Sequence, residues 1–327
     1  MPIGNSLITA YTHRNNIVNA AEDDDMQWCG DNVTPYDPTS VRMMFHNVRG
    51  IQLNNTSDKT IEFLSNEQVA SNIDILGISE VNLDTTNFRV YHQLQQQLAQ
   101  AFPGTSTMQF NSSPAISHTA YKPGGTGLLT IGQLTSRLDA NGKGGDPLGR
   151  WSHMHFRRKN QNPVTVISAY QVCVSPTNQI GNTAWHQQKR RLIEQGREDH
   201  PRKAFIDDLI DFIRQLQANN HDIILGGDFN ETLDAPASGL LRLATNTHLV
   251  DPWDYRFPTH PKFNTQKYGS KRIDSILLTP RLLPAITGLG YAPFDYIIDS
   301  DHRATVISFD TKKLFGDEVD MLLPGQF

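Results

Sequence analysis

The chain has 327 residues, of which 38% are hydrophobic and 19% are charged. This length allows one large domain or two small ones, and the composition supports a substantial core and excludes a disordered chain. The formal net charge of −5 argues against a protein that coats DNA, because sequence-independent affinity for nucleic acid comes mainly from Lys and Arg. It does not exclude a nucleic-acid enzyme, since a metal site adds carboxylates of its own.

The two cysteines, Cys29 and Cys173, are far apart in the sequence and predict neither a disulfide framework nor a thiolate metal site. Their scarcity favours a reducing compartment, so we expect an intracellular protein, with nucleus and cytoplasm equally open. No run approaches the roughly 18 apolar residues that a membrane-spanning helix requires, so no membrane span is expected.

Residues 1–40 are predicted to be a polar N-terminal tail, because they contain an acidic run at 22–25 and two prolines but no sustained periodicity. Residues 41–310 carry neither an internal repeat nor a clear linker, so we expect them to form one catalytic domain. Residues 311–327 are expected to be a C-terminal extension. Whether the chain is part of a larger protein, and which proteins it contacts, stays open.

From residue 41 onward, short apolar runs alternate with helical patterns. Strands are predicted at residues 41–45, 73–78, 127–134, 151–156, 164–172, 222–225, 272–278 and 304–309. Helices are predicted between the first two strands (apolar residues Ile61, Leu64 and Val69), from Phe88 to Phe102, and from Pro201 to the pair Asn219–Asn220. The Gly/Lys-rich stretch 141–149 is predicted to be an exposed loop.

Polar side chains follow several of these strands at the point where each strand ends. Asn47 closes the first strand, Glu80 closes the second, and Asp228 and Asn230 follow a third. Such groups, held in one pocket without a cysteine, indicate an oxygen-ligated hard cation and phosphoryl-ester chemistry. The alternatives are an Asx-rich turn at 228–230, bent by the two glycines before it, and a helix-capping or Arg-paired role for Glu80.

His302 stands out among the 12 histidines because Asp301 precedes it and a strand follows it. A lone histidine is more often structural than functional. Asp274 could accept from one nitrogen of this ring, which would fix the tautomer and favour the charged form.

Six short motifs, in this order along the chain, resemble the endonuclease/exonuclease/phosphatase superfamily. They are residues 45–47 (FHN), 77–80 (GISE), 168–170 (SAY), 227–230 (GDFN), 272–274 (RID) and 300–302 (SDH), and the match runs from about residue 41 to 309. Members of the superfamily include apurinic endonucleases, pancreatic-type deoxyribonuclease, retrotransposon endonucleases and inositol-phosphate phosphatases. The resemblance implies an α/β fold, a two-sheet sandwich flanked by helices in four layers, as in deoxyribonuclease.

The resemblance also implies a metal site and an attacking water. Glu80 is expected to bind Mg²⁺ (or Mn²⁺), with Asn47 and Asp301 close to the ion. Asp228 is expected to align or deprotonate the water. Attack on a phosphodiester needs such a positioned water together with positive charge at the phosphate oxygens.

Further residues are implied to handle the phosphate. Asn230 and His302 are expected to hold the scissile phosphate and stabilise the charge that develops on it, while Asp274 orients His302. Tyr170 is expected near the phosphate or the leaving group.

One departure and one addition follow Tyr170. The run 171–176 (QVCVSP) differs from the short Pro-Asn run that follows the tyrosine of apurinic endonucleases, so abasic-site specificity is not implied. The next segment contains Trp185 and three cations, Lys189, Arg190 and Arg191. It is predicted either to be an ordinary solvated helix or to lie along a nucleic-acid backbone. Lys271 and Arg272 belong to a second basic cluster.

The favoured function is therefore a divalent-metal-dependent phosphodiesterase that cleaves DNA, similar to the endonucleases of retroelements. The alternative is a phosphomonoesterase or a lipid- or inositol-headgroup phosphodiesterase on the same fold, since the fold does not select the substrate. A third possibility, a non-catalytic binding module, would require a damaged core, and every position matched above is intact.

Overall fold

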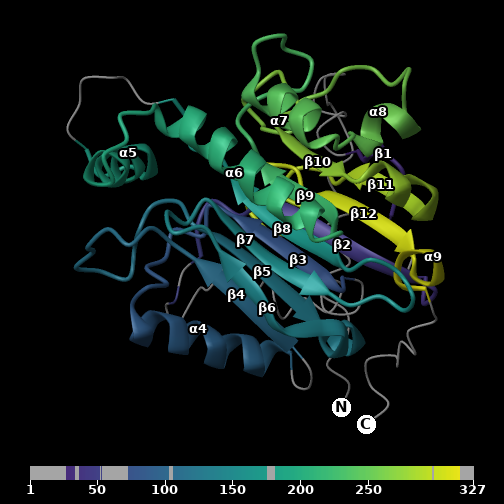
Figure 1. The fold of residues 1–327 in the computed structure, drawn as a ribbon, viewed down its shortest axis with the longest axis horizontal. Coiled ribbons are helices and arrows are strands. Elements are labelled where there is room, and N and C mark those ends of the chain that lie inside the picture. Colours follow the sequence, from purple (N-terminus) through teal and green to yellow (C-terminus); the bar gives the residue numbers. More distant parts are fainter. Residues whose placement is uncertain are drawn as a thin grey trace, which may run out of the picture.

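The structure is a computed structural model that describes residues 27–33, 37–51, 53, 73–102, 106–174, 181–296 and 298–316. The predicted helix around Ile61, Leu64 and Val69, most of the predicted tail and residues 317–327 lie outside the described residues. Two mixed sheets face each other between layers of helices (Figure 1), so the predicted fold class is confirmed.

The first sheet has seven strands in the order β1-β11-β12-β2-β3-β5-β4. Along the chain they are β1 (Cys29–Gly30), β2 (Ser40–Asn47), β3 (Ile75–Ser79), β4 (Ser106–Asn111), β5 (Thr126–Ile131), β11 (Ile286–Tyr291) and β12 (Thr305–Asp310). β2 and β3 are parallel, whereas the other pairs are antiparallel. Every residue of β2 and β3 is buried, as expected for central strands that are covered on both faces.

The second sheet has five strands in the order β10-β9-β8-β7-β6. They are β6 (Leu138–Gly145), β7 (Trp151–Phe156), β8 (Val164–Tyr170), β9 (Asp222–Asp228) and β10 (Asp274–Leu278). Only β8 and β9 are parallel. In the described part of the chain, the 3₁₀ helices η2 (Gly132–Arg137) and η3 (Pro280–Ala285) each lead into a strand, β6 and β11 respectively.

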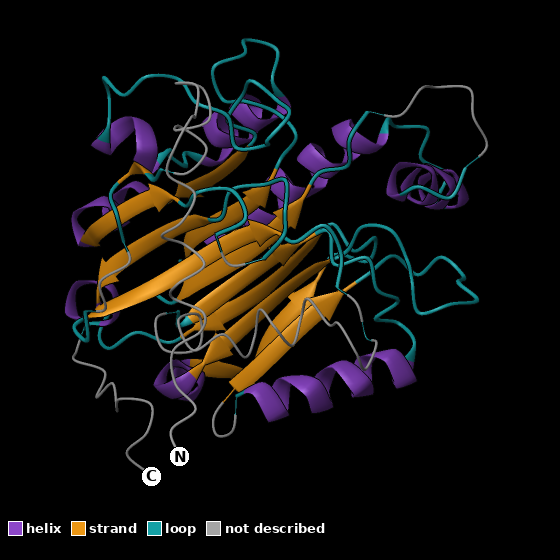
Figure 2. Cartoon of the chain, turned by 180° about the vertical axis from the view of Figure 1, so that it is seen from behind, coloured by secondary structure: helices purple, strands orange, loops and turns teal. Residues whose placement is uncertain are grey.

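Helices cover the outer faces of both sheets (Figures 1 and 2). Helix α4 (Phe88–Ala101) begins at the N-cap Asn87 and packs its apolar face on the seven-stranded sheet. Helices α6 (Pro201–Ala218) and α7 (Gly239–Thr247) cover the five-stranded sheet. The remaining helices of the described residues are α5 (Ala184–Glu194), α8 (Pro252–Arg256) and α9 (Thr311–Phe315). No helix within the described ranges is long and apolar enough to cross a membrane.

The core between the sheets depends on one close contact. Phe45 points from β2 toward the other sheet, where its ring lies over Gly226 of β9. A Cβ atom at Gly226 would lie 2.4 Å from the ring of Phe45, and one at Gly77 would lie 2.5 Å from it. Because real Cβ atoms do not approach so closely, the two glycines set how near the sheets can lie at this end.

The prediction of an exposed loop at residues 141–149 is wrong for the first half of this range. Residues 141–145 belong to β6, an edge strand that pairs with β7 through an irregular register, which explains its Gly-rich sequence. The second half, residues 146–149, is a turn held by hydrogen bonds, because the buried carboxylate of Asp146 accepts from the backbone N–H groups of Leu148 and Arg150. The strand predicted at 127–134 also ends early, and Leu134 lies in η2.

Both predicted termini include residues that join the fold. Cys29 and Gly30 extend the seven-stranded sheet by pairing with β11. Leu314 and Phe315 of α9 are fully buried in the core between the sheets. The domain boundaries at residues 40 and 311 stay predictions.

Candidate active site

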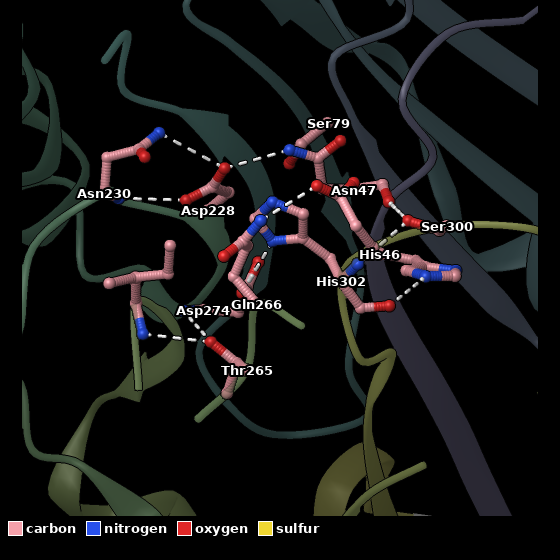
Figure 3. Close-up of polar contacts among 12 residues, drawn as sticks. His46, Asn47, Ser79, Asp228, Asn230, Thr265, Gln266, Asp274, Ser300 and His302 are labelled. Carbon is pink, nitrogen blue, oxygen red and sulfur yellow. Dashed lines mark hydrogen bonds and ion pairs between the residues drawn. The ribbon is translucent and has the colours of Figure 1, made fainter. Parts of the chain in front are cut away.

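The parallel strand pairs bring the predicted polar residues to one edge of the sandwich (Figure 3). Asn47 ends β2 and Glu80 follows β3, while Tyr170 ends β8 and Asp228 ends β9. The carboxyl ends of parallel strands meet at the same edge of a sheet, and β10 runs antiparallel to β9, so its first residue, Asp274, pairs with Asp228. The sequence rule that placed polar groups at strand ends therefore identified residues that lie together.

Asp228 is the most heavily constrained of these groups. Gly227 has a φ of 147°, and a Cβ atom there would lie 2.0 Å from the carbonyl oxygen of Ala169, so only glycine fits. The Asp228 carboxylate accepts from Asn47 Nδ2 at 2.9 Å and from the backbone N and Nδ2 of Asn230 at 2.9 and 3.2 Å. Burial, aided by the charge of Asp274, raises its pKa to about 7. A carboxylate with this pKa is suited to accept a proton from water near neutral pH.

Asn230 adopts a left-handed conformation with a φ of 49° and is fixed at both ends of its amide. Its Nδ2 also donates to the carbonyl of Gln171 at 2.7 Å, and its Oδ1 accepts from the thiol of Cys173 at 3.2 Å. The Asx-turn alternative is present as well, because the backbone N of Asn230 bonds the Asp228 carboxylate. Residues 228–230 therefore form an Asx turn and, with the same side chains, part of the candidate site.

His302 is held from three directions. Its Nδ1 lies 2.9 Å from Asp274 Oδ2, its backbone N donates to Ser300 Oγ, and its carbonyl is 3.0 Å from Nε2 of His46. Burial alone would lower the pKa of His302, but the Asp274 carboxylate raises it to about 10. The ring is therefore an imidazolium at neutral pH, with Nδ1 donating to Asp274 and Nε2 as its other donor.

A hydroxyl group braces the aspartate that orients His302. Thr265 is fully buried, and its Oγ1 accepts from the backbone N–H groups of Ile273 and Asp274 at 3.0 Å each. This contact fixes the start of β10 next to the end of β9.

Glu80 and Asp301 form the part of the site best suited to a hard cation. Burial raises the pKa of Glu80, hydrogen bonds from Asn47 and Tyr170 lower it, and the nearby charge of Asp301 raises it again. Asp301 accepts from Gln266 Nε2 at 2.9 Å. Two carboxylates close enough to repel each other are typical of an Mg²⁺ or Mn²⁺ site. Asn47 Oδ1 accepts from the backbone N of Arg49, so this amide directs its nitrogen toward the carboxylates.

A second group, Asp228, Asp274 and His302, also places potential ligand atoms within 4.8 Å of one another. The Asp274 carboxylate occupies Nδ1 of His302 and raises the pKa of the ring, so a metal at this group would compete with a proton for Nε2. We therefore expect these three residues to serve acid–base and phosphate chemistry, and we expect Glu80 and Asp301 to bind the metal, with Asn47 close by.

Tyr170 connects the site to α5. Its side chain is buried, and burial together with the charges of Glu80 and Asp228 raises the pKa of its hydroxyl well above the usual value. It therefore stays protonated and acts as a hydrogen-bond donor. On its other side it packs with Val172 and with Trp185 of α5, which is only 9% exposed. Trp185 is thus a buried anchor for α5 and does not reach out toward solvent.

The predicted nucleic-acid-binding cations are placed unequally. Lys189 and Arg190 donate to backbone carbonyl oxygens, of Glu198 and Gly181 respectively, which leaves their charges without an anionic partner among the described contacts. Arg191 pairs with Glu194 at 2.6 Å. Lys271 is exposed.

Arg272, by contrast, is largely buried. It pairs with Asp251, accompanied by a hydrogen bond to the Tyr291 hydroxyl, and lies over the ring of Trp253. These contacts favour a structural part for Arg272.

Several contact residues were not predicted as part of the site. His46 and Ser300 belong to the FHN and SDH motifs, so their positions next to Asn47 and near His302 could have identified them from the sequence. Thr265, Gln266 and Cys173 carry no comparable signal, because only the folded chain brings them to the cluster.

Comparison with known proteins agrees with this arrangement. The model of the Endonuclease/Exonuclease/phosphatase family matches residues 44–302. No curated protein matches the sequence significantly.

Three solved structures share the fold at low identity. The AP endonuclease LMAP from Leishmania major is 15% identical with a TM-score of 0.56, covering 90% of this chain and 99% of that one. The 3′ phosphatase NExo from Neisseria, bound to product DNA hairpin, is 18% identical with a TM-score of 0.54, covering 83% and 99%. The endonuclease domain of TRAS1, a telomere-specific non-LTR retrotransposon, is 14% identical with a TM-score of 0.50, covering 84% and 99%.

The Asp274–His302 pair predicts a specific pH effect. In Asp274→Asn the carboxylate that raises the pKa of His302 is gone, so burial dominates and the imidazolium is lost at lower pH. The alkaline limb of kcat for phosphodiester hydrolysis should therefore move down by roughly one pH unit or more. His302→Ala should be slow at every pH, and an unmoved alkaline limb in Asp274→Asn would contradict the assignment.

The two carboxylates Glu80 and Asp228 should respond differently to metal concentration. Glu80→Gln keeps an oxygen but loses the charge, so activity should recover as Mg²⁺ is raised. Asp228→Asn should lose activity by a factor of roughly 10²–10⁴ that added metal does not restore, because it removes the proton acceptor. Rates measured across a metal titration check both. If metal rescues Asp228→Asn and fails to rescue Glu80→Gln, the two roles are reversed.

Proposed function

The chain belongs to the endonuclease/exonuclease/phosphatase family, and from this we propose that it is a divalent-metal-dependent phosphodiesterase that nicks DNA. The observation that carries the proposal is the placement of Asp228. Donors from both sheets hold this carboxylate, and it lies beside the Asp274–His302 pair. Attack by water on a phosphodiester requires a proton acceptor for the water and a positively charged donor beside the phosphate, and here a carboxylate and an imidazolium lie next to each other.

In this proposal each side chain has one task. Asp228 orients the attacking water and takes up its proton. The imidazolium of His302 donates through Nε2 to the phosphate, where negative charge develops. The structure uses both donors of the Asn230 amide, for Asp228 and for the carbonyl of Gln171, so Asn230 holds the Asp228 carboxylate in place and does not contact the phosphate as expected from the sequence. The Tyr170 hydroxyl donates at the Glu80 side of the cluster. A divalent cation bound by Glu80 and Asp301 would supply further positive charge at the phosphate.

The DNA substrate is inferred from the surroundings of the site. Lys189 and Arg190 lie on α5, which packs on Tyr170 through Trp185, and Lys271 lies shortly before Asp274. These cations offer positive charge to a DNA backbone on a chain whose net charge is negative. The likeness to an AP endonuclease, to a 3′ phosphatase bound to product DNA and to a retrotransposon endonuclease supports nucleic acid, and the last supports a retroelement-type enzyme. Residues 41–310 would form most of the catalytic domain, with β1 from the tail and α9 from the extension completing it.

Plasmid nicking tests the activity directly. Supercoiled plasmid should relax with Mg²⁺ or Mn²⁺ and stay supercoiled in excess EDTA, because the proposed ligands are oxygen atoms that need a hard cation. Asp228→Asn, purified in parallel, controls for contaminating nuclease.

Two outcomes would overturn the proposal: nicking that persists in EDTA, or no nicking with either ion. Release of phosphate from an inositol phosphate under the same conditions, without nicking, would establish the alternative phosphatase function.

Helix α5 should contribute to DNA affinity and not to chemistry. Replacing both Lys189 and Arg190 with Ala should lower the slope of log affinity against log salt by up to about 2, roughly 0.9 per lost phosphate contact. Arg191 should add less, because Glu194 already offsets its charge.

Replacing Lys312 and Lys313 of α9 is a control with the same change of charge, on the other side of the molecule (Figure 1). Binding to a short duplex in EDTA, measured at several salt concentrations, gives both slopes. Equal slopes for the two double variants would assign α5 to ordinary solvated surface.

A further inference from the structure

A pocket of about 950 Å³ lies beside the active site, and none of the residues assigned to catalysis or metal binding lines it. Its walls come from the loop at 232–235, from α8 and the loop that follows it, and from residues 270–272. The volume is at the upper end of the range typical of pockets that bind small molecules. A cavity of this size is large enough to hold part of a substrate or another small ligand.

The floor of the pocket is aromatic. The indole of Trp253 lies 4.6–5.0 Å, centroid to centroid, from the rings of Phe257, Phe263 and His260. This cluster is rigid, since Trp253 is buried and Arg272 lies over its ring. Tyr255, which also lines the pocket, is 66% exposed. A rigid aromatic floor with exposed rings at Tyr255 and His260 is suited to a flat π-system that can stack.

The wall of the pocket carries cations. Lys271 is exposed, and Lys262 is exposed and paired with Asp234. The charge of Arg272 is balanced by Asp251, and its guanidinium packs over the ring of Trp253. Three carboxylates, of Asp234, Asp251 and Asp254, line the pocket beside these three cations, and Lys271 is the lining cation for which the described contacts give no carboxylate partner. Its charge lies beside the aromatic surface, a combination that suits a base attached to a phosphate.

Two stretches of chain connect the wall of the pocket to the catalytic residues. The loop that carries Asn230 runs on directly into the wall at Thr232, and residues 270–272 lead directly into Asp274. These stretches are joined, because the backbone N of Phe229 donates to the carbonyl of Ile273 at 3.0 Å. A strand whose phosphate lies at Asp228 and His302 can thus reach the pocket with a neighbouring nucleotide.

We propose that this pocket binds an unpaired nucleobase of the substrate strand, so that the enzyme acts on DNA with a single-stranded nucleotide next to the cleaved bond. The inference rests on the proposed function, because it takes the substrate to be DNA. Stacking supplies the affinity and tolerates any base, since every base has a π-face. Base-paired DNA cannot use the pocket without extruding a base, which has its own energetic cost.

The test uses the full chain in EDTA, so that binding is measured without cleavage. The probe is a single-stranded oligonucleotide with one 2-aminopurine, whose fluorescence is quenched by stacking. Tyr255→Ala should weaken binding of this probe by about 5- to 100-fold and reduce the quenching, while binding of a blunt duplex stays unchanged. Lys271→Ala should weaken binding while leaving the quenching at saturation intact.

Phe88→Ala is the matched control, because Phe88 is an aromatic residue 79% exposed on α4, away from the pocket. Equal effects of Tyr255→Ala and Phe88→Ala, or no loss of quenching in Tyr255→Ala, would overturn the proposal. Binding in EDTA separates the two proposals. Loss of quenching without any nicking would reject the nuclease and keep the pocket, whereas nicking with an unaffected Tyr255→Ala would reject the pocket alone.

Discussion

The hydrogen bond from Asn47 to Asp228 joins the two sheets at the point where the chemistry is expected. Asn47 ends a strand of one sheet and Asp228 ends a strand of the other, and their side chains meet at 2.9 Å. This geometry requires the sheets to lie close together, which the ring of Phe45 permits only because residues 77 and 226 are glycines. The sheet spacing and the position of the proton acceptor are therefore one constraint.

The charges of the site explain why a cation belongs there. Four carboxylates, of Asp228, Asp274, Glu80 and Asp301, surround a single imidazolium, that of His302. Burial and mutual repulsion raise the pKa of Asp228 and of Glu80, which means that each charge is costly without a partner. On the Asp274 side of the cluster, the positive charge of His302 balances part of this negative charge. On the Glu80 side, hydrogen bonds from Asn47 and Tyr170 and the more distant charge of His302 offset only part of the burial and of the repulsion from Asp301, so a divalent ion there would offset the rest.

The sequence was most informative where function and topology coincide. Polar residues directly after buried strands predicted Asn47, Glu80 and Asp228, because parallel strands deliver their ends to a common edge. The motif around His302 and the separate Asp274 were paired correctly, and the structure places them 2.9 Å apart. Their chemical roles stay predictions.

Other features depended on contacts between distant segments and left no local pattern. Thr265 is an ordinary residue in the sequence, and only the fold turns its hydroxyl toward the backbone of Asp274. Edge strand β6 has a composition that predicts a loop, and pairing with β7 overrides it. Trp185 lies in a segment predicted to be either a solvated helix or a nucleic-acid contact, yet its side chain is buried against Tyr170 and Val172.

Two elements flank the cluster, and each is anchored to it by a buried contact. On one side Trp185 of α5 packs on Tyr170, and on the other Arg272 pairs with Asp251 at the start of α8. Figures 1 and 2 place α5 and α8 on opposite sides of the molecule. Exposed residues of either element, such as Arg190 or Tyr255, can therefore vary in sequence without disturbing these buried contacts. This separation is a physical reason why a fold with one phosphate site can serve many substrates.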